Sequence, residues 1–281
     1  MEYAMDVQNL VMSYPRFTLK NVSFKLPCGY IMGFIGENGA GKTTTIKAVI
    51  NLIRRQSGDV KILGKGIDEA LKDIAVVLGD SSFPDGLTPK DMNFILRNAY
   101  PKWNSNTYSM YLEMFNLDPS KNIGTLSKGN KVKVMIAAAL SHEARLLVMD
   151  EPTSGLDPVF RSEILDVLHE YVQNDENSVF FSSHIVSDLE KISDYVTMIH
   201  DGEILFSMKL DDLMNRYRIV TLSKKEMANV NRKKLIGLRK TEFGSKALVL
   251  NGDFNADKYA LDTPTLEQIM LYNIKNEEKQ R

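Results

Sequence analysis

One eight-residue stretch constrains this chain more than any other feature. Gly36-Glu37-Asn38-Gly39-Ala40-Gly41-Lys42-Thr43 fits the pattern G-x-x-x-x-G-K-[ST], with an apolar strand before it and a helical pattern after it. The glycines let the backbone turn its N–H groups inward around phosphate oxygens, and the helix N-terminus adds a partial positive charge. The stretch therefore predicts a phosphate-binding loop, of the kind that GTPases, kinases and ATPases share.

The side chains of this loop have distinct predicted roles. Lys42 is expected to reach the β- and γ-phosphates of a bound nucleotide, and the Thr43 hydroxyl is expected to bind Mg²⁺. The other predicted nucleotide-binding residues of the segment are Gly36, Asn38, Gly39, Ala40, Gly41 and Thr44.

Composition narrows the class of partner. The chain has 281 residues, with 35 Lys and Arg against 36 Asp and Glu, so it lacks the broad basic field of a dedicated nucleic-acid binder and no nucleic-acid partner is expected. One cysteine, an N-terminus without a signal-like pattern and the lack of any apolar run of about 18 residues favour a cytoplasmic location. A membrane role would need another polypeptide.

The order of strand and helix patterns indicates an α/β fold around a parallel sheet. Residues 3–14, 19–27 and 30–36 read as strands, and the apolar spacing of 43–53 predicts a helix that ends in a turn at 56–59. Residues 83–140 read as an inserted helical subdomain.

The parallel-sheet pattern returns in the second half of the chain. Short, continuous apolar strands at 146–150 and 178–183 flank a helix at about 159–173, and 196–204 reads as a closing hairpin. We expect a first domain over 1–210 and an accessory region over 211–281, with weaker strand signals and a final amphipathic helix.

Two adjacent acids end the apolar strand at 146–150. The Asp150 carboxylate at the strand tip is suited to the Mg²⁺ shell, and Glu151 is suited to orient a water for in-line attack on the γ-phosphate. Ser127 and Gly129, in the segment Leu126-Ser127-Lys128-Gly129-Asn130, precede a helical pattern and predict a second anion site.

With these motifs in place, residues 5–210 resemble the ATP-binding cassette (ABC) family. The segment 126–130 stands at the position of the family signature LSGGQ, 154–157 is similar to the D-loop, and 182–184 to the switch-histidine loop. Tyr14 is similar to the aromatic residue that stacks on adenine. The C-terminal PTLEQIMLYNIK is most similar to ATPase subunits of ABC-2-type exporters from Gram-positive bacteria.

The resemblance implies a fold, an activity and partners. The fold is that of a P-loop NTPase, with a RecA-like core, an N-terminal antiparallel β subdomain, the helical subdomain and a small C-terminal extension. The activity is ATP hydrolysis coupled to transport, with ATP and Mg²⁺ as cofactors and Lys42, Glu151 and His184 as the catalytic residues.

The implied partners are a second ABC ATPase subunit, identical or related, and separate transmembrane permease subunits at the inner face of the cell membrane. Across the subunit seam, Ser127 and Gly129 are expected to bind the γ-phosphate of the partner's ATP. Asp157 is expected near the opposing P-loop, and His184 at the γ-phosphate of its own subunit.

The sequence also departs from the family pattern. The glutamine of the Q-loop is replaced by Gly79 and Asp80, so Asp80 is a candidate metal ligand whose carboxylate could approach Mg²⁺ or add repulsion at the γ-phosphate. In the signature, Lys128 and Asn130 replace glycine and glutamine; Lys128 is read either as a cation near the polyphosphate or as an exposed helix-start lysine.

Three apolar residues of the helical subdomain have two possible roles. In the ABC family this subdomain borders a groove that receives a short permease helix, but core packing is the favoured interpretation of Phe83, Leu87 and Phe94. The basic groups at 224–225, 232–234 and 239–240 are read as a solvated face rather than a lipid or partner contact.

Two other functions remain open at this level. A non-transport ABC ATPase of DNA repair would need a long coiled coil between the P-loop and the signature, and a translation factor usually carries two cassettes. A nucleotide-gated scaffold without catalysis fits the altered residues 79–80 but not the intact Lys42, Asp150, Glu151 and His184.

Overall fold

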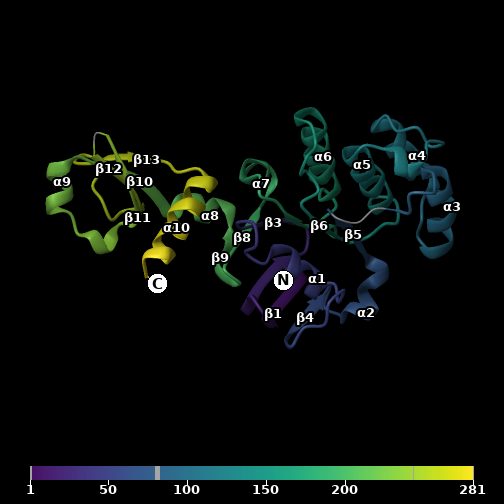
Figure 1. Cartoon of the computed structure of the whole chain (residues 1–281), viewed down its shortest axis with the longest axis horizontal. Coiled ribbons are helices and arrows are strands. Elements are labelled where there is room, and N and C mark those ends of the chain that lie inside the picture. The colour runs from purple at the N-terminus through teal and green to yellow at the C-terminus, as the bar shows by residue number, and fades with distance from the viewer. Residues whose placement is uncertain (1, 80–82, 243, 281) are drawn as a thin grey trace. The chain divides into compact units, whose positions relative to one another are not determined.

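The computed structural model describes residues 2–79, 83–242 and 244–280, and it divides into two compact units, Met1–Ser207 and Met208–Arg281 (Figure 1). The boundary predicted from the sequence lies between 210 and 211, at the start of α8 (Leu210–Arg216).

A six-stranded sheet forms the centre of the first unit. Its strands, in spatial order, are β5 (Ile74–Leu78), β6 (Leu146–Asp150), β7 (Ser178–Ser182), β3 (Ile31–Ile35), β8 (Tyr195–His200) and β9 (Glu203–Lys209). The pairs from β5 through β8 are parallel, and every residue of β3, β6 and β7 is buried. The continuous apolar strands of the sequence are therefore strands covered on both faces.

A three-stranded antiparallel sheet lies at the N-terminus, as predicted. Its order is β2 (Phe17–Pro27), β1 (Tyr3–Tyr14) and β4 (Ser57–Ile62). The prediction of a turn at 56–59 is wrong, because Ser57, Gly58 and Asp59 belong to β4. Gly58 has a φ of 100°, and a Cβ there would lie 2.6 Å from the carbonyl oxygen of Asn9. The glycine permits a close backbone approach beside a bulge in β1, which imitates a turn signal in the sequence.

Three phenylalanines join the antiparallel sheet to the central one. The ring of Phe24 in β2 stacks on Phe180 in β7 with centroids 5.3 Å apart, and Phe34 in β3 lies 5.2 Å from Phe180. All three side chains are buried. Because Phe34 is two residues before the glycine loop, this packing fixes the strand from which the loop departs.

Helices fill the rest of the first unit. They are α1 (Lys42–Val49), α2 (Ile67–Ala70), α3 (Pro89–Ala99), α4 (Ser105–Met114), α5 (Lys128–Ala139), α6 (Pro158–Tyr171) and α7 (Val186–Ile192), with 3₁₀ turns at Leu71–Asp73 and Ile123–Thr125. Helices α3, α4 and α5 confirm the helical interpretation of 83–140. Helix α1 is shorter than the predicted 43–53 and ends at Val49.

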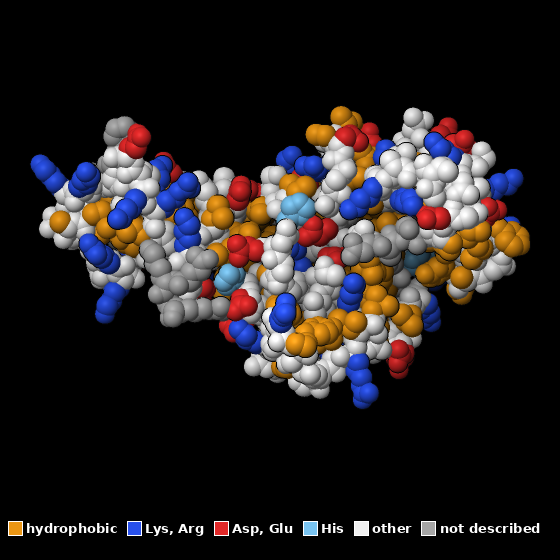
Figure 2. All heavy atoms as spheres, viewed as in Figure 1, with side chains coloured by type: hydrophobic (Ala, Val, Ile, Leu, Met, Phe, Trp, Pro, Cys, Tyr) orange, Lys and Arg blue, Asp and Glu red, His pale blue; other side chains and the backbone are white. Residues whose placement is uncertain are grey.

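The interpretation of Phe94 as a core residue is wrong. Its side chain is 61% exposed, and hydrophobic side chains gather over α3 in Figure 2. Met92 faces the core and is 4% exposed. Residues two positions apart on an α-helix project about 200° apart around the helix axis, so Phe94 points outward. Phe83 and Leu87 are half-buried.

The second unit is built on a small sheet of its own. Strand order is β11 (Ile236–Thr241), β12 (Gly244–Leu250), β10 (Tyr217–Leu222) and β13 (Ala260–Asp262), accompanied by α8, α9 (Lys224–Asn229), a 3₁₀ turn at Arg232–Lys234 and α10 (Leu266–Gln280). Its core contains Val220, Leu222, Ala247, Val249 and Phe254. In neither unit is a described helix long and apolar enough to span a bilayer.

Candidate nucleotide-binding and hydrolysis site

The glycine loop occupies the connection between β3 and α1. Gly41 is the N-cap of α1 with a φ of 113°, and a Cβ there would lie 2.6 Å from Cζ of the Phe17 ring. A side chain is therefore excluded by both the backbone conformation and the neighbouring ring. The N-terminus of α1 is left open toward the pocket, as anion binding requires.

Lys42 is held at the first turn of α1. Its Nζ donates to the carbonyl oxygens of Gly36 at 2.7 Å and Glu37 at 3.2 Å, and lies 3.4 Å from Oε1 of Glu151. The side chain is only 5% exposed. A buried ammonium needs such partners, and phosphate oxygens are suitable replacements for the carboxylate.

Asp150 lies at the end of β6, beside the P-loop. The Thr43 hydroxyl donates to Oδ2 at 2.7 Å, and the Ser182 hydroxyl, from the adjacent β7, donates to Oδ1 at 2.6 Å. Both carboxylate oxygens are thus bound, and the carboxylate is 5% exposed. Two segments separated by more than a hundred residues meet here because β6 and β3 both flank β7 in the sheet.

Glu151 follows directly but points elsewhere. Its φ is 50°, a left-handed conformation that is uncommon for a residue with a side chain, and its N–H donates to the Ser182 carbonyl and hydroxyl oxygens. Its carboxylate contacts Nδ1 of His184 through Oε2 and faces Lys42 through Oε1. The strained backbone turns this carboxylate toward the loop, as is common at functional sites.

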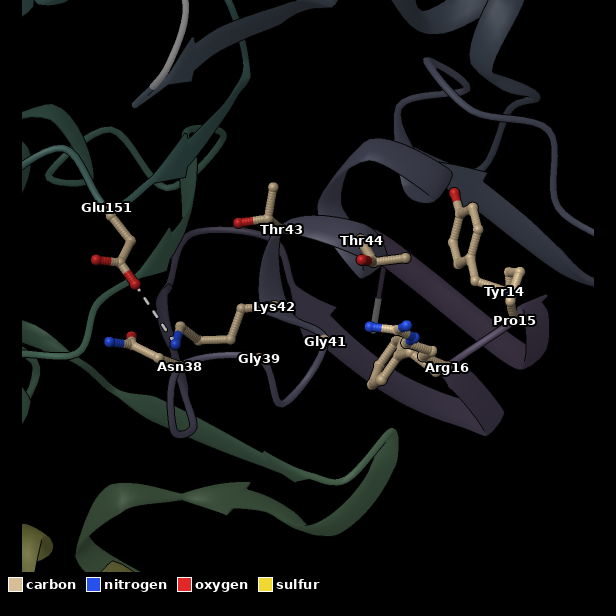
Figure 3. A pocket seen from close by; sticks show the side chains of 11 residues that line it. Tyr14, Pro15, Arg16, Asn38, Gly39, Gly41, Lys42, Thr43, Thr44 and Glu151 are labelled. Carbon is tan, nitrogen blue, oxygen red and sulfur yellow. Dashed lines mark ion pairs between the residues drawn. The ribbon is translucent and has the colours of Figure 1, made fainter.

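A pocket of about 770 Å³ extends along the loop (Figure 3). Glu151 and Lys42 lie at one end and Tyr14 at the other, with Thr43 and Thr44 between them. Tyr14 is 46% exposed, so its ring face is accessible for stacking. The complete lining is Tyr14, Pro15, Arg16, Phe17, Asn38, Gly39, Gly41, Lys42, Thr43, Thr44 and Glu151.

The three residues predicted to act across the subunit seam lie outside this pocket. Ser127 and Asp157 are exposed N-caps of α5 and α6: the Ser127 hydroxyl accepts from the N–H of Asn130, and the Asp157 carboxylate from that of Phe160. That hydrogen bond lowers the pKa of Asp157. Gly129 is half-buried in the first turn of α5. Within the described part of the chain none of the three lines the pocket that contains Lys42. Asp80 lies outside the described residues.

Sequence reasoning missed several groups around the pocket. Pro15, Arg16 and Phe17 form its wall beside Tyr14, because β1 and β2 are joined by a two-residue turn. The turn signal at Pro15 could have shown that these residues accompany Tyr14. His200 is another residue that no motif indicates, and its Nδ1 lies 3.3 Å from Oε2 of Glu37 in the P-loop.

The site consists of a strand, a glycine loop and a helix, with Thr43 bound to Asp150 at the end of β6 and Glu151 aimed at the loop. This arrangement defines a P-loop nucleoside triphosphatase. The family model for "ABC transporter" matches residues 19–154. The "Bacitracin transport ATP-binding protein BcrA" of Bacillus licheniformis is 34% identical over 207 residues, which cover 72% of this chain and 68% of that protein.

Two further comparisons extend over more of the relatives' length. The "Uncharacterized ABC transporter ATP-binding protein YcbN" of Bacillus subtilis is 30% identical over 89% of this chain and 91% of that protein. A solved structure titled "Structure of ATP binding subunit of ABC transporter" superposes with a TM-score of 0.65 at 27% identity, covering 75% of this chain and 91% of that one.

This chain belongs to the ATP-binding proteins of the ABC transporter family. It is an ATP-binding, ATP-hydrolysing subunit of a transporter, and members of the family work with transmembrane permease partners.

Proposed function

We propose that this chain powers an exporter by closing around ATP with a second cassette and reopening after hydrolysis. The observation that carries the proposal is the convergence of Lys42, Asp150, Glu151 and His184 from three separate segments at one end of one pocket. Relatives with transport names, such as the B. licheniformis bacitracin transport protein, support the export role. The proposed location is cytoplasmic, at the inner face of the membrane.

Hydrolysis would use these side chains in different ways. Lys42 exchanges its contact with Glu151 for the β- and γ-phosphate oxygens and stabilises the charge that develops on the transferred group. Glu151, released from Lys42, orients the attacking water in line with the γ-phosphate. His184, which already contacts Glu151, holds that carboxylate in place and reaches the γ-phosphate.

The Thr43 hydroxyl and the Asp150 carboxylate suit Mg²⁺. They are hard oxygen ligands 2.7 Å apart, and the described residues contain no cluster of three or more His, Cys, Asp or Glu that could hold a metal alone. Mg²⁺ prefers such sites, with one or two protein ligands and the rest from phosphate and water. When bound, Mg²⁺ supplies charge neutralisation for the triphosphate; Asp80 is a further proposed ligand.

The second cassette completes the site. Ser127 and Asp157 present helix N-termini to solvent, away from the pocket that contains Lys42. Such termini bind anions when one is brought to them. In the proposed dimer, Ser127 and Gly129 of one subunit contact the γ-phosphate on the other, with Asp157 beside the opposing loop, while Tyr14 stacks on adenine.

A groove beside α3 is the proposed docking place for the permease. An apolar groove of about 330 Å³ is lined by residues that include Leu71, Val76 and Tyr100, of which Leu71 and Val76 are 57% and 41% exposed. Val76 and Tyr100 also line a neighbouring pocket that includes Phe83. With exposed Phe94 on α3, this surface suits a short amphipathic helix of a transmembrane partner.

Substitution of Glu151 tests the dimer. Glu151→Gln is expected to bind MgATP without hydrolysing it and to elute as a dimer in size-exclusion chromatography, whereas the same variant with MgADP elutes as a monomer. Adding Lys42→Ala to this variant serves as the control, because it removes the phosphate contact and should restore the monomer. A Glu151→Gln protein that remains monomeric at saturating MgATP would refute dimerisation of this chain with itself, and the same runs with a co-expressed related cassette would then decide the mixed pair.

A further inference from the structure

The pocket wall contains a second cation that the motifs do not predict. Arg16 lies in the two-residue turn between Tyr14 and Phe17, which are paired across β1 and β2. The turn is fixed against the phosphate-binding loop, since the Phe17 ring occupies the space beside Gly41 that a Cβ would need. Arg16 is therefore held next to the N-terminus of α1.

Among the residues that the structure describes, none compensates the charge of Arg16. Lys42 has two carbonyl partners and Glu151, but no described residue forms a hydrogen bond or ion pair with the Arg16 guanidinium. A free guanidinium in a nucleotide pocket is a ready donor for phosphate oxygens, which it binds in a planar, bidentate geometry.

The position of Arg16 along the pocket indicates which phosphate of a nucleotide it can reach. Figure 3 shows the Arg16 side chain between the loop and Tyr14, beside Gly41 and Thr44 in this view, whereas Glu151 and the Lys42 ammonium lie at the other end of the pocket. Since Lys42 serves the β- and γ-phosphates, the space near Thr44 lies at the α-phosphate and ribose end of a nucleotide whose base stacks on Tyr14.

We infer that the Arg16 guanidinium binds the α-phosphate of the nucleotide and contributes to the affinity for ATP and ADP alike. This inference rests on the proposed binding mode, with Lys42 at the β- and γ-phosphates and adenine on Tyr14. It assigns Arg16 to holding the nucleotide through the whole cycle, whereas Lys42, Glu151 and His184 respond to the γ-phosphate. After hydrolysis, ADP would keep the Arg16 contact.

The test compares two nucleotides in matched variants by equilibrium binding. Arg16→Ala is expected to weaken ATP and ADP binding by about the same factor, three- to tenfold, because an exposed charge-assisted contact is of that strength. Arg16→Lys should recover part of the loss. Arg232→Ala, an exposed arginine of the second unit, is the control and should bind both nucleotides like the wild type.

Salt dependence gives a readout independent of folding effects. Since the contact joins two charges, raising the KCl concentration should weaken ATP binding to the wild type more steeply than to Arg16→Gln. Arg16 is exposed in a turn, so thermal unfolding of the variants should match the wild type. If Arg16→Ala nevertheless unfolds at a lower temperature than the wild type, the KCl dependence of ATP binding to the wild type and to Arg16→Gln decides. Equal KCl dependence of the two proteins would overturn the inference.

The outcomes separate this inference from the proposed function. Unchanged affinity of Arg16→Ala for both nucleotides, or a loss for ATP alone, overturns the α-phosphate assignment while Lys42→Ala still fails to bind. If the wild-type chain itself binds neither nucleotide, the proposed function is refuted and the role of Arg16 with it.

Discussion

The two units of this chain bury polar side chains to very different extents. The first unit buries Lys42, Asp150 and Ser182 among other polar residues, whereas Ser245 is the one buried polar side chain among the described residues of the second. Burying a charge is costly unless it is paired. In the first unit Lys42 and Asp150 are buried together beside the P-loop, where their polar partners can be exchanged for a nucleotide, whereas buried Asp73 and Asp188 lie elsewhere, beside Lys65 and Arg161. In the second unit, the buried side chains that the structure describes form a hydrophobic core.

The largest effect is expected from the buried lysine. Lys42→Ala removes the cation that faces the phosphates, and we expect ATP turnover, measured as phosphate release, to fall by at least about a hundredfold. Lys47→Ala, in the last turn of the same helix, should keep near-normal turnover. Normal phosphate release from Lys42→Ala would contradict the role of the buried lysine of the first unit in ATP turnover.

Core substitutions in the two units are expected to differ in their effect on ATP affinity. Phe180→Ala breaks the aromatic cluster behind the P-loop and should cost about 3–5 kcal/mol of stability together with ATP affinity.

Leu222→Ala creates a cavity in the small sheet and should cost about 2–5 kcal/mol in the stability of the second unit, with ATP affinity unchanged. Denaturant unfolding and ATP titration of both variants measure the two effects. Loss of ATP binding in Leu222→Ala would show that the units are coupled.

The aromatic end of the pocket is the next test. Tyr14→Ala should weaken ATP binding by about 1–3 kcal/mol, the typical range for stacking on a base, while Tyr14→Phe keeps the ring and should bind normally. Equal affinities of Tyr14→Ala and the wild type in a titration would exclude the stacking role.

The smallest effect is expected on the surface of the second unit. Lys246 lies 3.9 Å from Asp262, and both side chains are largely exposed. Lys246→Ala should therefore change the unfolding free energy by no more than about 0.5 kcal/mol, and turnover should not change. A clear loss of ATPase activity would show that this surface takes part in function.

The elements that could be predicted from the sequence are those whose local pattern indicates the same structure that the fold requires. The P-loop and the strands at 146–150 and 178–182 combine a continuous apolar run with turn or polar residues at the strand end, so strand, loop and side-chain direction could be predicted together. The pairing of Thr43 with Asp150 follows from this arrangement once the two strands are placed in one parallel sheet.

Other features depend on contacts that no local pattern records. Gly58 imitates a turn but serves a bulged strand, because only the partner strand requires its φ. Phe94 looks like a core residue, but its exposure depends on which side of α3 meets the domain. The place of Arg16 in the pocket depends on the packing of Phe17 against Gly41, two segments that are distant in the sequence.

A structure of Glu151→Gln saturated with MgATP tests the central claim most directly. We predict two cassettes in which each triphosphate touches Lys42 of one subunit and Ser127 and Gly129 of the other. A nucleotide whose every protein contact comes from one polypeptide would contradict the shared site.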